Sequence, residues 1–531
     1  MGQQPSTLQP PKPPKAASGN GTAASPTTPS ESLLGPSTGP LAVTPEKMGT
    51  ADVGIIGLAV MGPNLALNLL DRGFTVAVWN LETDACVKFV EENAPKYGAH
   101  KIVGAATYEG FAALLRRPRK TLILVMAGKP TDMVIDNLLR VCDAGDVIVD
   151  TGNAHFKEQT KRAELVESRG MRFLGMGVSG GAEGARKGPA FFPGGTRSVW
   201  EDIAPIVEAA AAKASDGRPC VTMCGVKGAG SCVKMYHNAG EYAVLQIWGE
   251  AVAALRSWGL SGESVRQVLA LWKGKGALDS YMLDITMEVV AKEALDAEGG
   301  LLLDQVADMI GSKGTGLWSV QEAMGVGEPV PSLAAAVTAR QMSMLRQTRL
   351  AIEAEVGGAR PAAAPPPAGQ PPPELLEDLY WAVYLAIVAS YAQMFAAIKA
   401  VDKAYGLEIT PNLARIISTF RAGCILQGAL LEPMTQAFAA NPNLPSLVCA
   451  FQPQIAQGLP AYRRTMARLV GAGTPLGVIS ASLTYMETMA TPQLVDAQVV
   501  ALQRDVFGRH GFYLIKDQKT LRNTEWPPMI P

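Results

Sequence analysis

One segment of the chain places four side chains that could do acid–base chemistry at helical spacing. They occupy positions i, i+3, i+4 and i+7 of a helix-like run, and they are Lys234, His237, Asn238 and Glu241. Residues with this spacing share one face of a helix. In an apolar cleft an amine loses its proton more easily and a carboxyl keeps its proton, so Lys234 and Glu241 could serve as base and acid. The alternative is a solvated face held by ion pairs, which Asn and His fill poorly.

A second segment combines glycines with donors for an anion. Residues 312–318 read Ser-Lys-Gly-Thr-Gly-Leu-Trp, so the backbone can approach an anion closely while Lys313 and Thr315 donate hydrogen bonds. Three further residues could add positive charge, namely Arg340, Arg504 and His510. Each of these is an ordinary surface residue when taken alone, so only their combination with the glycine turn predicts an anion site.

The run at residues 177–181 has two interpretations. Its pattern, G-x-S-x-G, is that of the nucleophile turn in serine hydrolases, in which an acid and then a histidine follow in the same fold. The downstream candidates, His237 and His510, both come after the predicted strands have ended. We therefore favour the second interpretation, in which the run offers donors to the carboxylate of a ligand. These donors are Ser179, Gly180 and Gly181.

A glycine-rich turn lies between two segments of different periodicity. Residues 52–58 are apolar and β-branched, as in a buried parallel strand, and residues 64–70 have the pattern of a helix. The turn has the form G-x-A-x-x-G and includes Gly57, Leu58, Ala59, Val60, Met61 and Gly62. Its glycines allow a tight turn, and the helix N-terminus that follows favours a pyrophosphate. The segment therefore predicts a dinucleotide site.

The next strand, predicted at residues 74–79, ends at a position that selects the cofactor. It is followed by Asn80, Leu81 and Glu82. An acidic residue at this point holds a ribose 2′-hydroxyl, whereas an Arg accommodates a 2′-phosphate. Glu82 without an adjacent Arg therefore favours NAD when these residues alone are considered.

The elements that must position these residues change in type along the chain. Further strands are predicted at residues 121–126, 147–150 and 172–175, with helical stretches between them, and long helices begin at about residue 229. Alternating strands and helices predict a doubly wound parallel sheet with ligands at the carboxyl ends of its strands. The expected fold is an α/β Rossmann-type dinucleotide-binding domain, a large all-α domain and a C-terminal tail. Their predicted ranges are residues 51–228, 229–503 and 504–531.

Composition places the chain among proteins with a large buried core. Of its 531 residues, 48% are apolar and 18% are charged, and the formal net charge is −1. This balance argues against nucleic acid as a partner, because a dedicated binder carries a basic excess. The seven cysteines form no CxxC pair, which predicts a reducing compartment and argues against a zinc site. No run of about 18 uncharged apolar residues is present, so no stable membrane insertion is expected.

Two segments differ from the rest in composition. Residues 1–50 hold ten of the 38 prolines and no aromatic residue, which predicts a disordered extension. The extension lacks the apolar region of a secretory signal, so we expect a cytoplasmic protein, with plastid targeting or N-myristoylation at Gly2 as alternatives. A proline-rich tract at about residues 358–374 predicts a surface insertion between two helices.

Several motifs together resemble the 6-phosphogluconate dehydrogenase family over about residues 51–526. They are IGLAVMGPNLALN (56–68), DTGN (150–153), GVSGGAEGAR (177–186), VKMYHNAGEY (233–242), D-x-x-GSKGTGLW (308–318), RAGCIL (421–426) and QRDVFGRH (503–510). The resemblance implies oxidative decarboxylation of 6-phosphogluconate to ribulose 5-phosphate and CO2 with reduction of NADP and without a metal. It also implies that Lys234 takes the proton of the carbon-3 hydroxyl and that Glu241 protonates carbon 1.

The same resemblance implies three groups of ligand contacts. Contacts to the carboxylate and hydroxyls of the substrate fall on Asn153, Ser179, Gly180, Gly181, His237 and Asn238. Contacts to its phosphate fall on Tyr242, Lys313, Thr315, Arg340 and Arg504, with His510 closing the site. Contacts to the cofactor fall on Gly57, Leu58, Ala59, Val60, Met61, Gly62, Asn80, Leu81, Glu82, Val125, Met126, Ala127 and Asn153. Because the family takes the tail segment from the second subunit, a homodimer is implied.

Two departures from the family pattern concern the cofactor. The family's Arg after the second strand is Leu81 here, and its Lys of the V-K-A motif is Met126. Both changes remove positive charge near the 2′-phosphate. We therefore expect a weakened preference for NADP, with use of NAD or low activity as the consequence.

Two alternatives to this function are left open by the sequence. A same-fold oxidoreductase for another hydroxy acid would lack Lys313, Arg340 and Arg504, all of which are present. The other alternative is a paralogue that prefers NAD or is not catalytic. A non-catalytic chain would be expected to break the pair of Lys234 and Glu241, and this pair is intact.

Overall fold

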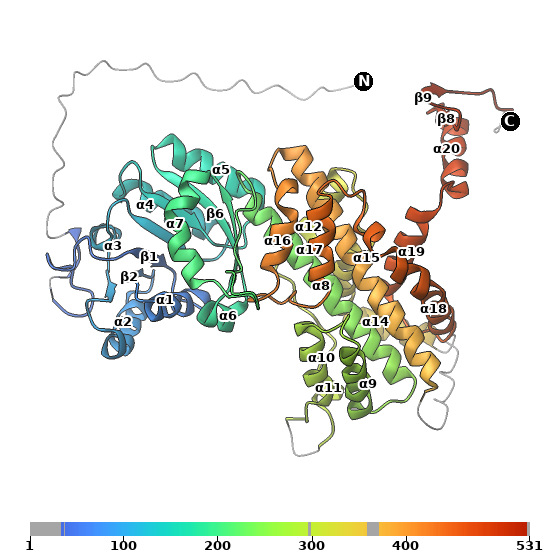
Figure 1. Cartoon of the computed structure of the whole chain (residues 1–531), viewed down its shortest axis with the longest axis horizontal. Helices are drawn as coiled ribbons and strands as arrows, with labels where there is room; N and C mark the ends of the chain where they lie inside the picture. The colour runs from blue at the N-terminus through green and yellow to red at the C-terminus, as the bar shows by residue number, and fades with distance from the viewer. Residues whose placement is uncertain (1–32, 37, 296–298, 358–370, 528–531) are drawn as a thin grey trace.

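The computed structural model describes residues 33–36, 38–295, 299–357 and 371–527. The first half of the chain folds as an α/β domain, the second half as a helical domain, and a short tail follows (Figure 1). The predicted fold class is confirmed. The helical domain begins with helix α8 at Ala229, where the sequence pattern changes.

A seven-stranded sheet in the order β3-β2-β1-β4-β5-β6-β7 forms the centre of the α/β domain. The strands are β1 (Val53–Ile56), β2 (Val76–Trp79), β3 (Ile102–Gly104), β4 (Lys120–Ile123), β5 (Val147–Asp150), β6 (Arg172–Ser179) and β7 (Ala190–Gly195). The first six are parallel, and β7 is antiparallel to β6. The strand order reverses between β1 and β4, which is where ligands bind in sheets of this kind.

Helices cover both faces of this sheet (Figure 1). They are α1 (Met61–Asp71), α2 (Thr83–Tyr97), α3 (Tyr108–Leu114), α4 (Lys129–Val141), α5 (Phe156–Ser168), α6 (Gly181–Lys187) and α7 (Arg197–Ala210). Apolar residues of α1, α2 and α7 form one core against the sheet, and those of α3, α4 and α5 form a second core on the other face. The apolar strands are therefore covered on both sides, as parallel sheets require.

The chain before β1 packs on the edge of the sheet, which corrects the prediction of a disordered extension through residue 50. Leu41 is only 2% exposed and belongs to the core that contains α1 and α2. A Cβ at Gly104 on β3 would lie 2.6 Å from the Leu41 side chain, so glycine leaves the space that Leu41 fills. The amide of Gly49 donates to the carbonyl of Ala113 at 2.9 Å. Residues 1–32, and with them the Gly2 acylation motif, lie outside the described residues.

Two long buried helices form the centre of the helical domain. They are α8 (Ala229–Ser257) and α15 (Pro373–Tyr405), and both contribute most of their residues to one large core. Residues 379–398 of α15 carry no charged side chain, so the expected absence of a long uncharged apolar run is wrong. By length and composition α15 could cross a membrane, but 89% of its most apolar window is buried inside the protein, so it is a core helix. The proline-rich tract falls between α14, which ends at Val356, and α15. Most of this tract, residues 358–370, lies outside the described residues.

Further helices surround this pair. They are α9 (Gly262–Gly274), α10 (Tyr281–Ala291), α11 (Leu302–Gln305), α12 (Thr315–Gly325), α13 (Pro331–Met344), α14 (Arg346–Val356), η3 (Thr410–Asn412), α16 (Leu413–Thr419), α17 (Leu431–Ala440), η4 (Leu447–Phe451), α18 (Gln452–Gly471) and α19 (Gly477–Ala490). Helix α12 packs on α8, where the Ser319 hydroxyl donates to the carbonyl of Met235, the residue after Lys234.

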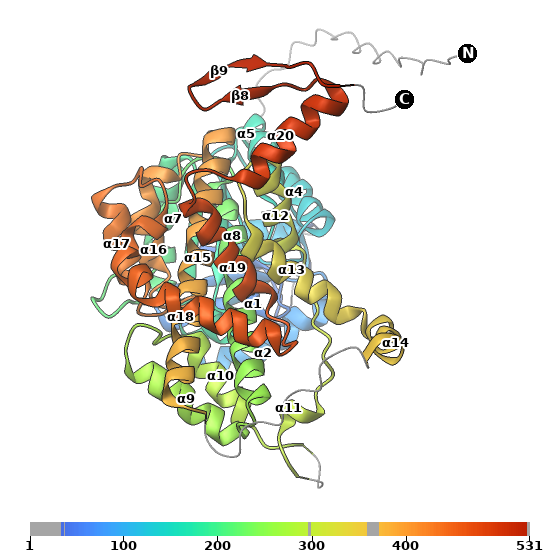
Figure 2. The same cartoon turned by 90° about the vertical axis from the view of Figure 1, so that its right-hand side faces the viewer.

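The C-terminal tail projects from the body of the molecule in both views (Figures 1 and 2). It consists of α20 (Val495–Gly508) and the antiparallel strands β8 (Phe512–Leu514) and β9 (Asp517–Arg522). The buried carboxylate of Asp505 accepts hydrogen bonds from the amide of Thr524 at 3.1 Å and the indole of Trp526 at 2.8 Å. The tail is thus a folded arm that starts at Val495, which corrects the predicted boundary at residue 504.

Candidate active site

A cleft of about 1200 Å³ separates the carboxyl edge of the sheet from the helical domain. Its walls come from the loops after β1, β4, β5 and β6 on one side, and from α8, α12, α13 and the segment at residues 423–427 on the other. The cleft therefore lies at the point where the strand order reverses, so the sheet brings a nucleotide site and the stripe on α8 to one space.

Lys234 and Glu241 both line this cleft from α8. Lys234 is 7% exposed, and its desolvation lowers the pKa of the amine. Desolvation likewise raises the pKa of the Glu241 carboxyl, although the charges of Lys234 and Arg340 oppose that rise. Burial therefore favours the uncharged form of both groups, as a base and an acid require. The prediction of a buried stripe is confirmed, and the alternative of a solvated face is wrong.

His237 lies behind Lys234 and does not line the cleft itself. The imidazole is fully buried, with Nδ1 at 3.5 Å from the Lys234 amine and Nε2 at 3.5 Å from the Ser179 hydroxyl. Burial, assisted by the charge of Lys234, keeps the pKa of His237 well below its usual range, so the ring is neutral. The contact of His237 with the substrate stays a prediction, and in this structure the imidazole connects Lys234 on α8 to Ser179 at the end of β6.

The contact of Ser179 with His237 invites a comparison with serine hydrolases, which the geometry rejects. A hydrolase triad needs a carboxylate on the second nitrogen of the imidazole. Here Nδ1 of His237 lies 3.3 Å from the amide oxygen of Asn238 and next to the Lys234 amine. An amide and an amine cannot stabilise an imidazolium as a carboxylate does, so the arrangement lacks the acid of a triad.

The loops after β5 and β6 bring the predicted carboxylate contacts into the cleft. The residues that line it there are Asn153, Ser179, Gly180 and Gly181, and Asn238 faces them from α8. Gly180 has a φ of +118° and approaches the carbonyl of Gly423 so closely that a Cβ would lie 2.8 Å from this oxygen. Only glycine suits both conditions. The turn therefore keeps its backbone close to the cleft.

The other end of the cleft gathers the predicted phosphate contacts. They are Tyr242, Lys313, Thr315 and Arg340. The guanidinium of Arg340 lies over the Tyr242 ring at 3.3 Å from its centroid, and the side-chain amide of Asn238 donates to the Thr315 hydroxyl at 3.3 Å. Thr315 opens helix α12 directly after Gly314, whose φ of +89° makes the turn. Two cations beside a helix N-terminus suit a phosphate.

Arg504 and His510 do not reach the cleft of their own chain. Both lie on the projecting tail and are exposed. The resemblance implies that these two residues contribute to the cleft of a second subunit, and their position away from the cleft of their own chain agrees with that expectation.

The glycine turn after β1 is shaped for a pyrophosphate. Gly57 has a φ of +103°, and a Cβ on Gly62 would lie 1.8 Å from the Gly57 carbonyl oxygen, so both positions require glycine. Val60 and Met61 at the start of α1, together with Val125 after β4, line the cleft. Asn80 fixes the turn because its side-chain oxygen accepts from the Leu58 amide at 2.8 Å. These residues fit a dinucleotide at the positions that the sequence predicts.

The side chains expected at the 2′-end of the adenosine carry no positive charge. Leu81 is 76% exposed and Met126 is 77% exposed. The Glu82 carboxylate accepts from the side-chain amide of Asn80 at 2.8 Å and, within the described residues, has no ion-pair partner. The remaining predicted cofactor residues, Ala59 and Ala127, belong to the same loops after β1 and β4. The glycine turn thus fits a pyrophosphate. The part of the site expected beside the 2′-position of the adenosine offers the carboxylate of Glu82 and the apolar side chains of Leu81 and Met126.

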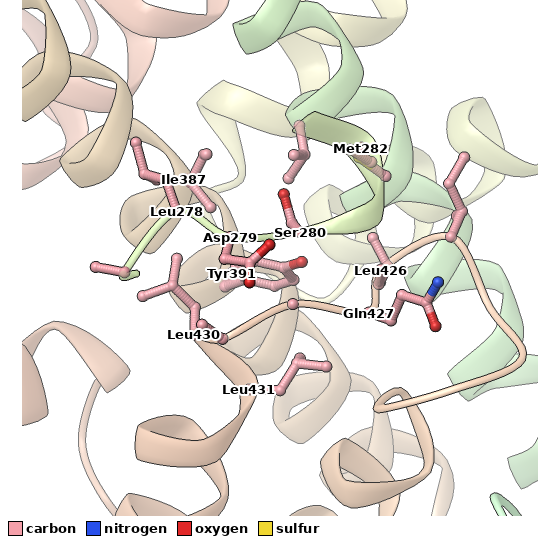
Figure 3. Close-up of a pocket in the computed structure, with 15 residues that line it drawn as sticks. Leu278, Asp279, Ser280, Met282, Ile387, Tyr391, Leu426, Gln427, Leu430 and Leu431 are labelled. Carbon is pink, nitrogen blue, oxygen red and sulfur yellow. The ribbon is translucent and has the colours of Figure 1, made fainter. Parts of the chain in front are cut away.

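Several cleft residues were missed by the sequence analysis. They include Thr151, Gly152, Lys187, Tyr281, Gly311, Cys424 and Gln427. Gln427 was identifiable, because it follows the RAGCIL motif directly. A smaller cavity of about 20 Å³ adjoins the cleft and shares Ile425 and Gln427 with it. Figure 3 shows this cavity among apolar side chains such as Leu278, Leu426 and Leu430, and its volume suits about one water and no sugar phosphate.

Comparison with known proteins agrees with this geometry. Residues 52–225 match the model of the NAD binding domain of 6-phosphogluconate dehydrogenase, and residues 230–526 match that of its C-terminal domain. The decarboxylating 6-phosphogluconate dehydrogenase of Trypanosoma brucei brucei is 52% identical over 481 residues, which are 90% of this chain and 99% of that protein. The enzyme of the same name from Escherichia coli K12 is 38% identical over 482 residues, 90% of this chain and all of that protein.

A solved structure extends the comparison to three dimensions. The 6-phosphogluconate dehydrogenase of Plasmodium falciparum is similar with a TM-score of 0.83 and 31% identity, covering 90% of this chain and 100% of that chain. The agreement spans both domains and the tail. The chain therefore belongs to the 6-phosphogluconate dehydrogenase family.

Proposed function

We propose that this protein converts 6-phosphogluconate to ribulose 5-phosphate and CO2 while NADP is reduced. One observation carries the proposal: Lys234 and Glu241 face the same cleft, and burial shifts the pKa of each toward its uncharged form. The Plasmodium structure, which is described in complex with NADP+ and with 6-phosphogluconate, supports these two ligands. The decarboxylating enzymes from Trypanosoma and Escherichia support the reaction.

The chemistry needs a base first and an acid afterwards. The uncharged amine of Lys234 accepts the proton of the carbon-3 hydroxyl. The bound nicotinamide supplies the acceptor for the hydride of carbon 3. In the 3-keto acid, the bond to the carboxylate breaks, CO2 leaves, and its electron pair moves toward the ketone, which Lys234 is placed to protonate. The protonated carboxyl of Glu241 then delivers a proton to the carbon that lost CO2, which becomes carbon 1 of ribulose 5-phosphate, while Lys234 takes back the hydroxyl proton of the enediol to leave the product ketone.

The other cleft residues orient the substrate along this path. Ser179 and the backbone of Gly180 and Gly181 are placed to bind the carboxylate, while Lys313 and Arg340 bind the phosphate at the opposite end. With both ends fixed, the middle carbons pass beside Lys234 and Glu241. Such orientation converts binding into rate, because the reacting atoms are held close together.

We also propose a homodimer in which the tail of one subunit completes the cleft of the other. The tail is folded around Asp505 but exposes large apolar side chains, including Val495 at 67% and Phe507 at 74%. An exposed apolar surface on a folded arm is typical of a contact with another chain. Mixing a Lys234→Met variant with an Arg504→Ala variant under subunit exchange should restore part of the activity that each lacks alone. No recovery in exchanged heterodimers would argue against a shared site.

The cellular site is proposed to be the cytoplasm. All seven cysteines are free, and five of them are buried. Free thiols of this kind are typical of a reducing compartment. Fractionation of cells that express the full chain, with and without residues 1–32, tests this proposal and the alternative of plastid targeting.

A single assay tests the proposed reaction. The full chain is incubated with 6-phosphogluconate and either NADP or NAD, and the absorbance of the reduced nicotinamide and the release of CO2 are followed together. Equal amounts of both products are expected. Reduction without CO2 would point to a simple hydroxy-acid dehydrogenase, and no reduction with either nucleotide would point to a non-catalytic paralogue.

A further inference from the structure

A cluster of polar and aromatic side chains joins the two domains outside the cleft. It consists of His155, Lys157, Glu322 and Tyr405, none of which lines the cleft. His155 and Lys157 lie at the start of α5 in the α/β domain, Glu322 is on α12, and Tyr405 ends α15. Three elements from two domains therefore meet at one carboxylate.

Glu322 is the centre of this cluster. One of its oxygens, Oε1, lies 2.7 Å from the Lys157 amine and 3.3 Å from Nε2 of His155. The other, Oε2, accepts from the Tyr405 hydroxyl at 3.3 Å. The side chains of Glu322 and His155 are 13% and 17% exposed, whereas that of Lys157 is 41% exposed, so solvent screens the ion pair with Lys157 more than the contact with His155.

The imidazole of His155 is held in a defined orientation. Its Nδ1 accepts from the Lys157 amide at 3.2 Å, which leaves Nε2 as the donor toward Glu322. The ring also stacks on Phe156 and meets the edge of Trp318 on α12, with centroids 4.9 and 5.7 Å apart. The Lys157 amine lies over the Tyr405 ring at 4.7 Å. The junction is thus fixed by ring packing as well as by charge.

Each side of this junction leads directly to one wall of the cleft. Asn153, which lines the cleft on the nucleotide side, is two residues before His155 in the same short loop. Thr315, which lines it on the phosphate side, is two turns before Glu322 on helix α12. Because a helix is stiff over this length, a shift at Glu322 moves Thr315 at the start of α12.

We propose that Glu322 is a positioning residue, which sets the spacing between the nucleotide wall and the phosphate wall of the cleft through its contacts with His155 and Lys157. Glu322 does not line the cleft itself. Its effect is to hold the carbon-3 hydrogen of the sugar acid and the nucleotide at reacting distance. This inference rests on the proposed function, because it assigns the two walls to the two ligands of that reaction.

The test compares Glu322→Ala and Glu322→Gln with the full-length wild type. Every kcat is measured at one temperature, at least 20 °C below the lowest melting midpoint of the set, so that only folded protein is counted. Loss of alignment by a fraction of an ångström should lower the kcat of Glu322→Ala by about tenfold, with a larger primary isotope effect from substrate deuterated at carbon 3. Glu322→Gln keeps an oxygen for Lys157 and His155 and should recover part of this loss.

A matched control and a double variant separate positioning from general stability. Glu487→Ala removes a carboxylate that also joins two helices, since it accepts from Arg463 at 2.6 and 2.9 Å. This control should leave kcat unchanged. Lys157→Met combined with Glu322→Ala should be no slower than the slower single variant, because both act through one contact.

Two results would overturn the inference. One is a Glu322→Ala variant with kcat and isotope effect within twofold of wild type, whatever its melting midpoint. The other is full additivity of the Lys157 and Glu322 effects. Failure of the proposed function looks different, because the wild type itself would then reduce no nucleotide with 6-phosphogluconate.

Discussion

The two ends of the cleft differ sharply in charge. At the sugar end, Lys313 and Arg340 surround the space beside Tyr242, and Lys234 stands behind them. At the adenosine end, Leu81 and Met126 are exposed, and the Glu82 carboxylate lies beside Asn80 in the same loop. One end is therefore built for a phosphate, whereas at the other end the two positions predicted beside a 2′-phosphate, Leu81 and Met126, carry no positive charge.

This difference indicates that recognition of the sugar acid and the choice between NAD and NADP depend on separate residues of the cleft. The glycine turn recognises a pyrophosphate through backbone geometry, which both NAD and NADP share. Recognition of the sugar acid depends on charged side chains of the helical domain, of which Lys313 and Arg340 line the cleft. The choice between the two nucleotides depends on a few side chains after β2 and β4, which can change without disturbing the rest of the site.

The largest effect is expected from Lys234→Met. Without the base, kcat should fall by about a thousandfold or more, since general base catalysis contributes up to about 10⁴. The melting midpoint should stay equal or rise at neutral pH, because the unfolded chain carries this amine charged and burial lowers its pKa. Spectrophotometric assays and thermal unfolding measure both.

Lys187→Met is the control for this experiment. Lys187 lines the rim of the same cleft but is exposed and paired with Glu183 at 2.6 Å. Its replacement should change kcat by less than twofold. Substantial turnover by Lys234→Met would remove Lys234 from the role of base.

The second prediction concerns the pH dependence of kcat/KM. Lys234 must be uncharged to accept a proton, so activity falls as pH drops through its pKa, which burial has lowered. Glu241 must be protonated to donate, so activity falls as pH rises through its pKa, which burial has raised. We expect a bell-shaped profile for the wild type, and a Glu241→Gln variant about a hundredfold slower that lacks the limb at high pH. Retention of both limbs would assign the high-pH limb to another group.

The third prediction tests the sugar end alone. Arg340→Met removes a cation from the phosphate site but keeps an apolar side chain against Tyr242. A hydrogen bond between charged groups contributes about 1.5–3 kcal/mol, so KM for 6-phosphogluconate should rise about 10- to 100-fold. KM for the nucleotide should not change. A parallel rise of both KM values would mean that the two ends are coupled, contrary to the comparison above.

The sequence predicts the parts of this molecule whose structure is local. The turn at residues 57–62 and the stripe on α8 follow from spacing, because a turn or one helix face brings such residues together without help from distant segments. Strand β3 has only three residues, and β7 contains a proline and two glycines. Such segments do not show strand periodicity and become strands only through their neighbours in the sheet.

The remainder depends on packing between distant segments. Leu41 is buried because Gly104, more than sixty residues later in the chain, leaves space for its side chain. The proline-rich composition around Leu41 gives no sign of this contact. The position of His237 behind Lys234 depends on its contact with the Ser179 hydroxyl at the end of β6, a residue 58 positions earlier in the chain. The contact between Lys157 and Glu322 joins residues 165 apart. None of these follows from local pattern.

The smallest effect is expected at the adenosine end. It tests most directly whether the two ends of the cleft differ in their recognition of phosphate. Leu81→Arg places a cation beside the predicted 2′-phosphate position, where the exposed Leu81 leaves room for it. A partly screened ion pair of this kind is worth about 1 kcal/mol, so kcat/KM with NADP should rise about fivefold while that with NAD stays level or falls. Leu81→Gln is the matched control, because it adds a polar side chain without charge and should leave the ratio unchanged. A wild type with a large advantage for NADP that Leu81→Arg does not alter would mean that another group recognises the 2′-phosphate. The contrast in charge between the two ends of the cleft would then not hold.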